Sequence, residues 1–218
     1  MSDVKATGYR RPTSTQHAVL DELRLWIHSG RLQPGEKVLQ EDVAGELGTS
    51  VVPVREALKT LQSEGLLVHH PNRGFFVTKL SEDELVELCD IRSALESLAV
   101  EKALVALNDE ALIRMNELIV AMEDADRAGE IGNLIRLDRA FHFTLFSASE
   151  SPQLIRMIDM TWDQSDAYRS AFFIEPSHRS ATHREHRQIL EATIRRDLKA
   201  ICALLDTHRL TPVQVLHN

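Results

Sequence analysis

Asp138 and His142 are the residues whose types and spacing point most directly to chemistry. They lie four positions apart in a segment whose apolar residues recur at helical spacing, so both side chains occupy one face of the expected helix. A carboxylate and an imidazole on one face can converge on a single point. The same pair also fits a buried histidine that hydrogen-bonds to a neighbour, so the spacing alone does not separate a metal site from an ordinary core contact.

Two later helical segments carry further histidines. One supplies His183 or His186, and the other supplies His208. One carboxylate with two or three imidazoles from different helices is a suitable ligand set for a borderline divalent ion such as Zn²⁺, Ni²⁺ or Mn²⁺. The residues alone therefore permit a divalent metal site inside a helical bundle, beside the alternative of ordinary buried histidines, and they leave the choice between His183 and His186 open.

A second group of residues lies at the start of a short helix near the N-terminus. This group is Ser50, Val51, Val52, Arg55 and Lys59. In a helix–turn–helix, the second helix enters the major groove and presents such positions to the bases. Arg55 can address guanine or a phosphate and Lys59 a phosphate, whereas the two valines can contact only thymine methyl groups. The same helix pair also occurs as a simple packing unit, so it does not by itself indicate DNA binding. The segment that follows provides the further evidence.

Two β-prone runs follow this helix. Residues 66–69 and 75–78 are joined by a five-residue connection containing Pro, Asn and Gly, which predicts a hairpin. Arg73 and Gly74 lie at its tip, where an arginine can reach the minor groove or the phosphate backbone. The order helix, helix–turn–helix, hairpin is that of a winged helix, and it favours DNA binding.

The elements that must position these residues are mostly helices. Apolar periodicity and capping signals predict helices over 16–28, 41–47, 50–64, 82–107, 110–128, 131–149, 152–174, 178–196 and 198–210. Ser81 and Glu84 match a capping box, which puts a boundary near residue 80. We therefore expect a mainly α protein with a polar arm (1–12), a winged helix–turn–helix domain (13–79) and an all-helical bundle (80–218).

The composition fits such a protein and leaves DNA binding open. The 218 residues are 43% hydrophobic and 27% charged, with a net charge of −8, which excludes wholesale disorder. Residues 1–79 carry ten Lys or Arg and nine Asp or Glu, so the acidic excess lies in the remainder. No apolar run approaches the ~20 residues of a membrane span. Because the two cysteines lie in helical patterns, we expect a cytoplasmic protein with no disulfide framework and no membrane partner.

The N-terminal motifs resemble the DNA-binding domain of the GntR family of bacterial transcriptional regulators. The resemblance rests on LQPGEKVLQEDVAGELGTSVVPVREALKTLQSEGLLVHHPNRGFFV. It implies that Arg55 contacts DNA and that the backbone at Gly74 forms the wing contact. The family usually has Arg-Thr after the serine, where this chain has Val51-Val52. A main base-reading arginine is thus missing, so either the operator differs from the usual one or base readout is weaker.

The second part resembles the FCD ligand-binding domain of the FadR subgroup of that family. The resemblance rests on DRAFH (138–142), EHRQIL (185–190), His208 and the opening DIRSALE (90–96). It implies metal ligands at Asp138, His142, His186 and His208. It also implies a small carboxylate effector, for which Arg92 is the first candidate partner and Tyr168 and Arg169 are further ones. A homodimer on a palindromic double-stranded operator is then expected, because one winged helix covers too few base pairs to be selective.

Two alternatives remain at this point. One is a ligand-responsive regulator whose helical domain binds its effector through arginines and holds no metal. The other is a small metal-dependent hydrolase, in which the metal activates water and Glu185 beside His186 acts as the base. A winged helix has no role in a hydrolase, so we expect a regulator and not an enzyme.

Overall fold

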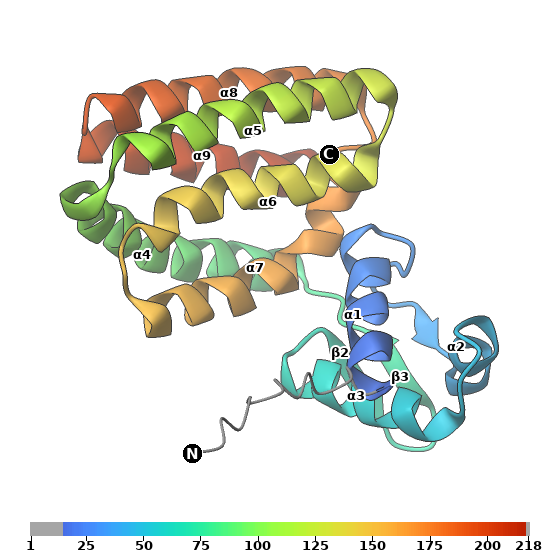
Figure 1. Cartoon of the computed structure of the whole chain (residues 1–218). Coiled ribbons are helices and arrows are strands. Elements are labelled where there is room, and N and C mark those ends of the chain that lie inside the picture. The colour runs from blue at the N-terminus through green and yellow to red at the C-terminus, as the bar shows by residue number, and fades with distance from the viewer. Residues whose placement is uncertain (1–14, 217–218) are drawn as a thin grey trace, which may run out of the picture.

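The computed structural model describes residues 15–216, apart from the side chains at positions 166, 167, 170, 171 and 212–216. It consists of a small N-terminal part with a hairpin and a larger helical part. In Figure 1 the helical part is drawn above the N-terminal part. The polar arm predicted over 1–12 lies outside the described residues.

The N-terminal part forms because three short amphipathic helices share one apolar core. These helices are α1 (Thr15–His28), α2 (Gln40–Glu46) and α3 (Val51–Ser63). Leu23, Val54, Ala57, Leu58 and Leu61 in this core have no exposed surface. The turn between α2 and α3 contains Gly48 at a φ of +61°, a backbone conformation that glycine adopts without strain.

A three-stranded antiparallel sheet completes this part. Strands β2 (Leu67–His70) and β3 (Gly74–Val77) form the expected hairpin, and β1 (Lys37–Val38) pairs with the other edge of β3. The sequence did not predict β1, because two residues are too few to show an alternating pattern. The predicted helix–turn–helix and wing are both present.

The helical part consists of six helices that pack against one another. They are α4 (Glu82–Ala106), α5 (Asp109–Ala128), α6 (Ile131–Ser147), α7 (Pro152–Phe172), α8 (Pro176–Ile194) and α9 (Leu198–Leu216). The Ser81–Glu84 capping box is formed in full at the start of α4. Asn108 caps α5, and Gly129 ends it in the left-handed conformation. Their common core includes fully buried Phe141, Phe146 and Ile201.

The mainly α fold class is confirmed, with nine helices in the described residues. Most predicted helix ends are within two residues of the observed ones, and the largest difference is the extension of α9 from the predicted end at 210 to Leu216. Cys89 and Cys202 are free thiols, and Cys89 is buried. Over residues 15–216, no helix combines the length and apolar composition that crossing a bilayer requires.

The two parts touch through α1, α7 and the short linker before α4. His28 on α1 lies 3.9 Å from Asp163 on α7. In the linker, the backbone N–H of Leu80 donates a 2.6 Å hydrogen bond to the hydroxyl oxygen of Tyr168 on α7. The helical part is therefore connected to the N-terminal part by a polar contact as well as by the chain itself.

Candidate metal centre and DNA-binding surface

Helix α6 carries Asp138 and His142 into the middle of the helical part. The two residues share the buried face of α6 with Phe141 and Leu145, so the helix must bury both polar groups when it buries its apolar stripe. Asp138 has no exposed surface, and His142 is 1% exposed. Buried polar groups of this kind require partners that compensate their lost hydration.

Their partners come from α8 and α9. His186 on α8 is fully buried, and its Nε2 lies 3.0 Å from Oδ1 of Asp138. The Nε2 atom of His142 lies 3.2 Å from Nε2 of His186 and 3.1 Å from Nε2 of His208 on α9. All four ligand atoms lie within 4.8 Å of one another. We call Asp138, His142, His186 and His208 the Asp/His cluster.

The spacing of these atoms fits a divalent ion. Ligand atoms ~2.1 Å from an ion are separated by ~3.0 Å at a 90° angle and by ~3.4 Å in a tetrahedron. Three of the observed separations are between 3.0 and 3.2 Å, and Oδ1 of Asp138 lies 4.0 Å from Nε2 of both His142 and His208. Two ring nitrogens that face each other can share only one proton, so a central cation satisfies the donor set better than hydrogen bonds do.

The protonation states also suit a metal. Burial lowers the pKa of His142 well below its ordinary value, and neighbouring His208 lowers it further. Burial likewise lowers the pKa of His186, against the opposing effect of Asp138. Burial favours the neutral form of Asp138, but the Arg169 guanidinium and His186 outweigh it and hold the pKa of this carboxyl well below its usual range. Neutral imidazoles and an ionised carboxylate are the forms that bind metal.

Glu185 orients one of the imidazoles. Its Oε2 lies 2.7 Å from Nδ1 of His208, and since an ionised carboxylate only accepts hydrogen bonds, Nδ1 carries the proton. Nε2 of His208 therefore directs a lone pair toward the cluster, as in the carboxylate–histidine–metal arrangement of metalloproteins. The sequence had suggested Glu185 as a catalytic base in the hydrolase alternative, whereas here its carboxylate is engaged with a ligand histidine.

The structure also shows which of His183 and His186 belongs to the Asp/His cluster. His183 lies one turn before His186 on α8, and its Nε2 contacts Oδ2 of Asp126 at 3.0 Å. Arg179 binds the other oxygen of the same carboxylate, with its Nε 2.5 Å from Oδ1. His183 thus fastens α8 to α5, and His186 belongs to the Asp/His cluster.

A network of buried charges lies beside the Asp/His cluster. Glu96 is 1% exposed and accepts hydrogen bonds from Arg92 Nε at 2.9 Å, Arg209 Nη2 at 2.7 Å and Trp162 Nε1 at 2.7 Å. Burial opposes ionisation of Glu96, but Arg92 and Arg209 outweigh it and lower the pKa of this carboxyl. Arg169 forms an ion pair with Asp138. These contacts connect α4, α7 and α9 to the centre of the cluster.

The arginines surround a small, largely enclosed cavity of ~40 Å³. Its wall includes His208 from the cluster and all three predicted effector residues, Arg92, Tyr168 and Arg169. Arg209 also lines the cavity and was not predicted from the sequence. Its position directly after His208 was the available signal, but an arginine near the end of a helix is exposed far more often than it is buried.

On the N-terminal part, the predicted DNA contacts surround the start of α3. Ser50 occupies the N-cap position, but its side chain makes no capping hydrogen bond. Val52 is 67% exposed, while Val51 is partly buried and packs against the core. Arg55 is exposed and donates a 3.2 Å hydrogen bond from Nε to Oε1 of Gln40.

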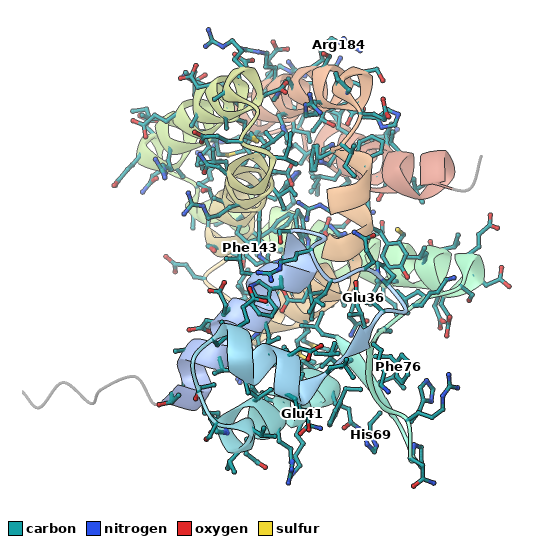
Figure 2. All side chains as sticks on the ribbon, turned by 90° about the vertical axis from the view of Figure 1, so that its right-hand side faces the viewer. Glu36, Glu41, His69, Phe76, Phe143 and Arg184 are labelled. Carbon is teal, nitrogen blue, oxygen red and sulfur yellow. The ribbon has the colours of Figure 1, made fainter. Side chains whose placement is uncertain are left out.

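Two further predicted contacts lie on the same surface and on the wing. Lys59 is exposed one turn after Arg55 and pairs with Glu56 at 2.9 Å. At the hairpin tip, Gly74 has a φ of +94°, a conformation that favours glycine. The neighbouring Arg73 guanidinium lies 5.4 Å from the ring centre of Phe76. Figure 2 shows the hairpin, marked by His69 and Phe76, projecting away from the helical part.

A winged helix–turn–helix followed by a helical domain with an enclosed cavity lined by arginines and apolar side chains is typical of one class: DNA-binding transcriptional regulators that carry an effector domain. Residues 15–77 match the model of the bacterial regulatory proteins of the gntR family, and residues 87–210 match the FCD domain. The chain belongs to the GntR family and carries an FCD domain.

Proteins that are similar to this chain in sequence or structure include named regulators of transcription. The HTH-type transcriptional regulator McbR of Escherichia coli K12 is 31% identical over 72% of this chain and 71% of its own length. The Nta operon transcriptional regulator of Aminobacter aminovorans is 31% identical over 74% and 75%. A solved structure of E. coli McbR/YncC covers 94% of this chain, and 97% of that chain is matched, with a TM-score of 0.83 and 26% identity. These relatives are named as regulators, in keeping with a regulatory role for this chain.

Proposed function

We propose that this chain is a metal-dependent transcriptional regulator of the FadR subgroup, whose operator affinity responds to a small carboxylate. The observation that carries the proposal is the Asp/His cluster, in which four ligand atoms from three helices lie within 4.8 Å of one another. Its DNA target would place the protein in the cytoplasm.

Operator recognition is assigned to the surface around the start of α3. Arg55 would contact a base edge or a phosphate in the major groove, and Lys59 would contact a phosphate. Arg73 and the backbone at Gly74 would contact the minor groove or the backbone through the wing. Ser50 and exposed Val52 lie at the same helix start, where a hydroxyl and a methyl group can meet a phosphate and a thymine.

The metal would be held by Asp138, His142, His186 and His208, and their donor set suits Zn²⁺, Ni²⁺ or Mn²⁺. Bound there, the ion supplies a positive charge that attracts an anionic oxygen. Arg169, paired with Asp138, keeps the buried carboxylate ionised. Arg92 and Tyr168 line the same cavity as Arg169, so an acid bound beside the metal would contact these side chains.

Tyr168 offers a route from the cavity to the DNA-binding part. Its side chain lines the cavity, and its hydroxyl accepts a hydrogen bond from the N–H of Leu80 in the linker. A ligand that moves this ring changes the position of the linker and hence of the winged helix. Because a ligand shifts an equilibrium only by its difference in affinity for the two states, the effect must be reciprocal: operator DNA alters effector affinity by the same factor.

A homodimer would provide the two half-sites of a palindromic operator. Helix α4 supports this with three exposed apolar side chains at intervals of seven, Ile91, Leu98 and Val105. Residues seven apart lie on one stripe of a helix. A second copy of the chain that packs against this stripe would remove it from water.

The metal proposal is tested by metal analysis of protein equilibrated with Zn²⁺ and then desalted. We expect about one ion per wild-type chain and close to none for His142→Ala. The matched control is His183→Ala, which removes an imidazole of α8 that contacts Asp126 and lies outside the cluster; it should retain the ion. Equal metal content in His142→Ala and wild type would favour the metal-independent regulator instead.

A further inference from the structure

The cavity beside the Asp/His cluster has two chemically different ends. Helices α4 and α7, which form two of its walls, run antiparallel, because Glu96 contacts Trp162, Arg92 contacts Ser165 and Leu80 contacts Tyr168. Residues early in α4 and late in α7 therefore lie at the linker end. Residues farther along α4 lie at the deep end, near the cluster.

The deep end is lined by charged groups. Arg92 and Arg209 pair there with Glu96, and Arg169, although it follows Tyr168 on α7, extends its side chain to Asp138; all three arginines are less than 9% exposed. Arg209 also pairs with Asp206, so the three arginines are balanced by three carboxylates, and a divalent ion in the Asp/His cluster would give the deep end an excess of positive charge. A buried excess charge favours an anionic ligand.

The linker end is apolar. One stripe of α4 carries Leu85, Leu88 and Cys89 at this end, one turn before Arg92, and Phe172 of α7 faces the same space. All four of these apolar residues are buried. A charged or hydroxylated group placed there loses hydration and gains no hydrogen bond in return, which is unfavourable.

The hydroxyl groups in the cavity wall are already engaged within the protein. Ser165 accepts from Arg92 and donates to the carbonyl of Trp162. Thr182 donates to the carbonyl of His178, and the Tyr168 hydroxyl is bonded to Leu80. These groups are poorly placed to recognise hydroxyl groups of a sugar acid or hydroxy acid.

One donor in the wall remains without an acceptor. Nε of Arg209 is buried and has no hydrogen-bond partner among the residues that the structure describes, although Nη1 and Nη2 bind Asp206 and Glu96. Arg209 is 7% exposed and follows His208 directly in the sequence. A buried N–H without an acceptor is unfavourable, and a ligand carboxylate at the deep end would satisfy it with a charge-assisted hydrogen bond.

We propose that the effector is a short, unsubstituted aliphatic monocarboxylate, with its carboxylate at the deep end on Arg209 and its alkyl chain against Leu85, Leu88 and Phe172. This inference rests on the proposed function and specifies the ligand class. The ~40 Å³ cavity is far smaller than the ~300–1,000 Å³ pockets that hold drug-sized ligands. The alkyl chain ends beside Tyr168, so its length determines how far the ligand presses on the linker contact.

The test is isothermal titration calorimetry of the Zn²⁺-loaded full chain with acetate, propionate, butyrate, valerate and hexanoate. Affinity should rise about four-fold for each methylene that enters the apolar end, reach an optimum at roughly three to five carbons, and then fall. Succinate should bind at least about ten-fold more weakly than butyrate, and lactate more weakly than propionate, because their extra polar groups meet the apolar wall.

Two variants make the test specific to this cavity. Leu88→Ala should move the optimum to acids about one or two carbons longer, because it removes wall volume. Leu154→Ala, a change at another buried leucine that does not line the cavity, should leave the optimum in place. Arg209→Lys keeps the positive charge but replaces the guanidinium, and with it Nε and the Nη atoms that bind Asp206 and Glu96, by one ammonium group; it should weaken all the acids by about ten-fold or more without changing the preferred length.

The outcomes separate this inference from the proposed function. Tighter binding of succinate or lactate than of the length-matched fatty acid, or an unchanged optimum in a folded Leu88→Ala variant, overturns the monocarboxylate assignment and leaves a metal-dependent regulator. If the Zn²⁺-loaded protein binds no acid of any of these classes, both the assignment and the proposed carboxylate effector are wrong.

Discussion

The two parts of this molecule differ in where their candidate functional residues lie. These residues are on the surface in the N-terminal part and in the interior in the helical part. In the N-terminal part, Arg55, Lys59 and Arg73 are exposed above an apolar core that contains none of them. In the helical part, Asp138 and His142 are at most 1% exposed and lie inside the core itself. The comparison teaches that the proposed DNA contacts can be changed without changing the core of the first part, while in the second part the proposed ligand residues are themselves part of the core.

The energetic reason is desolvation. Exposed ion pairs contribute little to stability, typically ~0–1 kcal/mol. Buried charges lose their hydration, and removing one partner leaves the other without compensation, which is destabilising by ~3–5 kcal/mol. Variants in the two parts should therefore differ both in the size of their effects and in which property they change.

The largest effect is expected from Asp138→Ala combined with His208→Ala. The double variant removes two of the proposed metal ligands and leaves Arg169 buried without its carboxylate. We expect it to lose the metal, to blunt the effector response, and to lower the free energy of unfolding by ~3–5 kcal/mol. Urea denaturation and metal analysis measure this. The control is Asp124→Ala, which breaks an exposed pair with Arg127 and should change stability by less than ~0.5 kcal/mol. A fully stable double variant that still responds to effector would reject the site.

The second effect is the loss of operator binding in Arg55→Ala. We expect affinity for a duplex that the protein itself selects from a random pool to fall by ~1–3 kcal/mol, about five- to 150-fold, with relaxed specificity at one position. Thermal unfolding should not change, because Arg55 is exposed and bonded only to Gln40 among its described contacts. Fluorescence anisotropy measures the affinity. Unchanged affinity would show that α3 does not read the operator as proposed.

A third, smaller effect tests the connection between the two parts. Tyr168→Phe keeps the ring and removes the hydroxyl that binds Leu80, a hydrogen bond that contributes ~0.5–1.5 kcal/mol. Metal content should not change, while the factor by which effector alters operator affinity should decrease several-fold. Anisotropy titrations with and without effector give that factor. If the variant keeps the wild-type factor, the signal travels by another route.

The smallest effect is expected from Lys59→Ala. This side chain is exposed and pairs only weakly with Glu56 on the same helix. Loss of one phosphate contact should weaken binding by a similar amount for every sequence and reduce the slope of log affinity against log salt by about one. Anisotropy at several salt concentrations provides the slope. A slope equal to that of the wild type would remove Lys59 from the interface.

The N-terminal part was predictable from sequence because its signals are local. The α3 start, the glycine turn and the hairpin each depend on neighbouring residues. Only β1 was missed, because Lys37 and Val38 become a strand by pairing with Phe75 and Phe76, far away in the sequence.

In the helical part, the helices were predictable from the sequence, but the contacts between them were not. Asp138 and His142 share a face through local spacing, but the partners are determined by packing between helices. His183 and His186 are equivalent by spacing, and the resemblance alone favoured His186. Glu96 and Arg209, which are ordinary surface residue types, became part of the buried network only through contacts across α4 and α9. No local pattern in the sequence predicts that Glu96 and Arg209 are buried.

The central claim is that occupancy of the Asp/His cluster controls DNA binding, and one paired titration tests it most directly. Operator affinity is measured by anisotropy for Zn²⁺-loaded wild type and for His142→Ala, each with and without the carboxylate that binds the wild type most tightly. We expect the acid to change wild-type affinity by at least about five-fold and to leave His142→Ala unchanged. An equal change in both proteins would contradict the account.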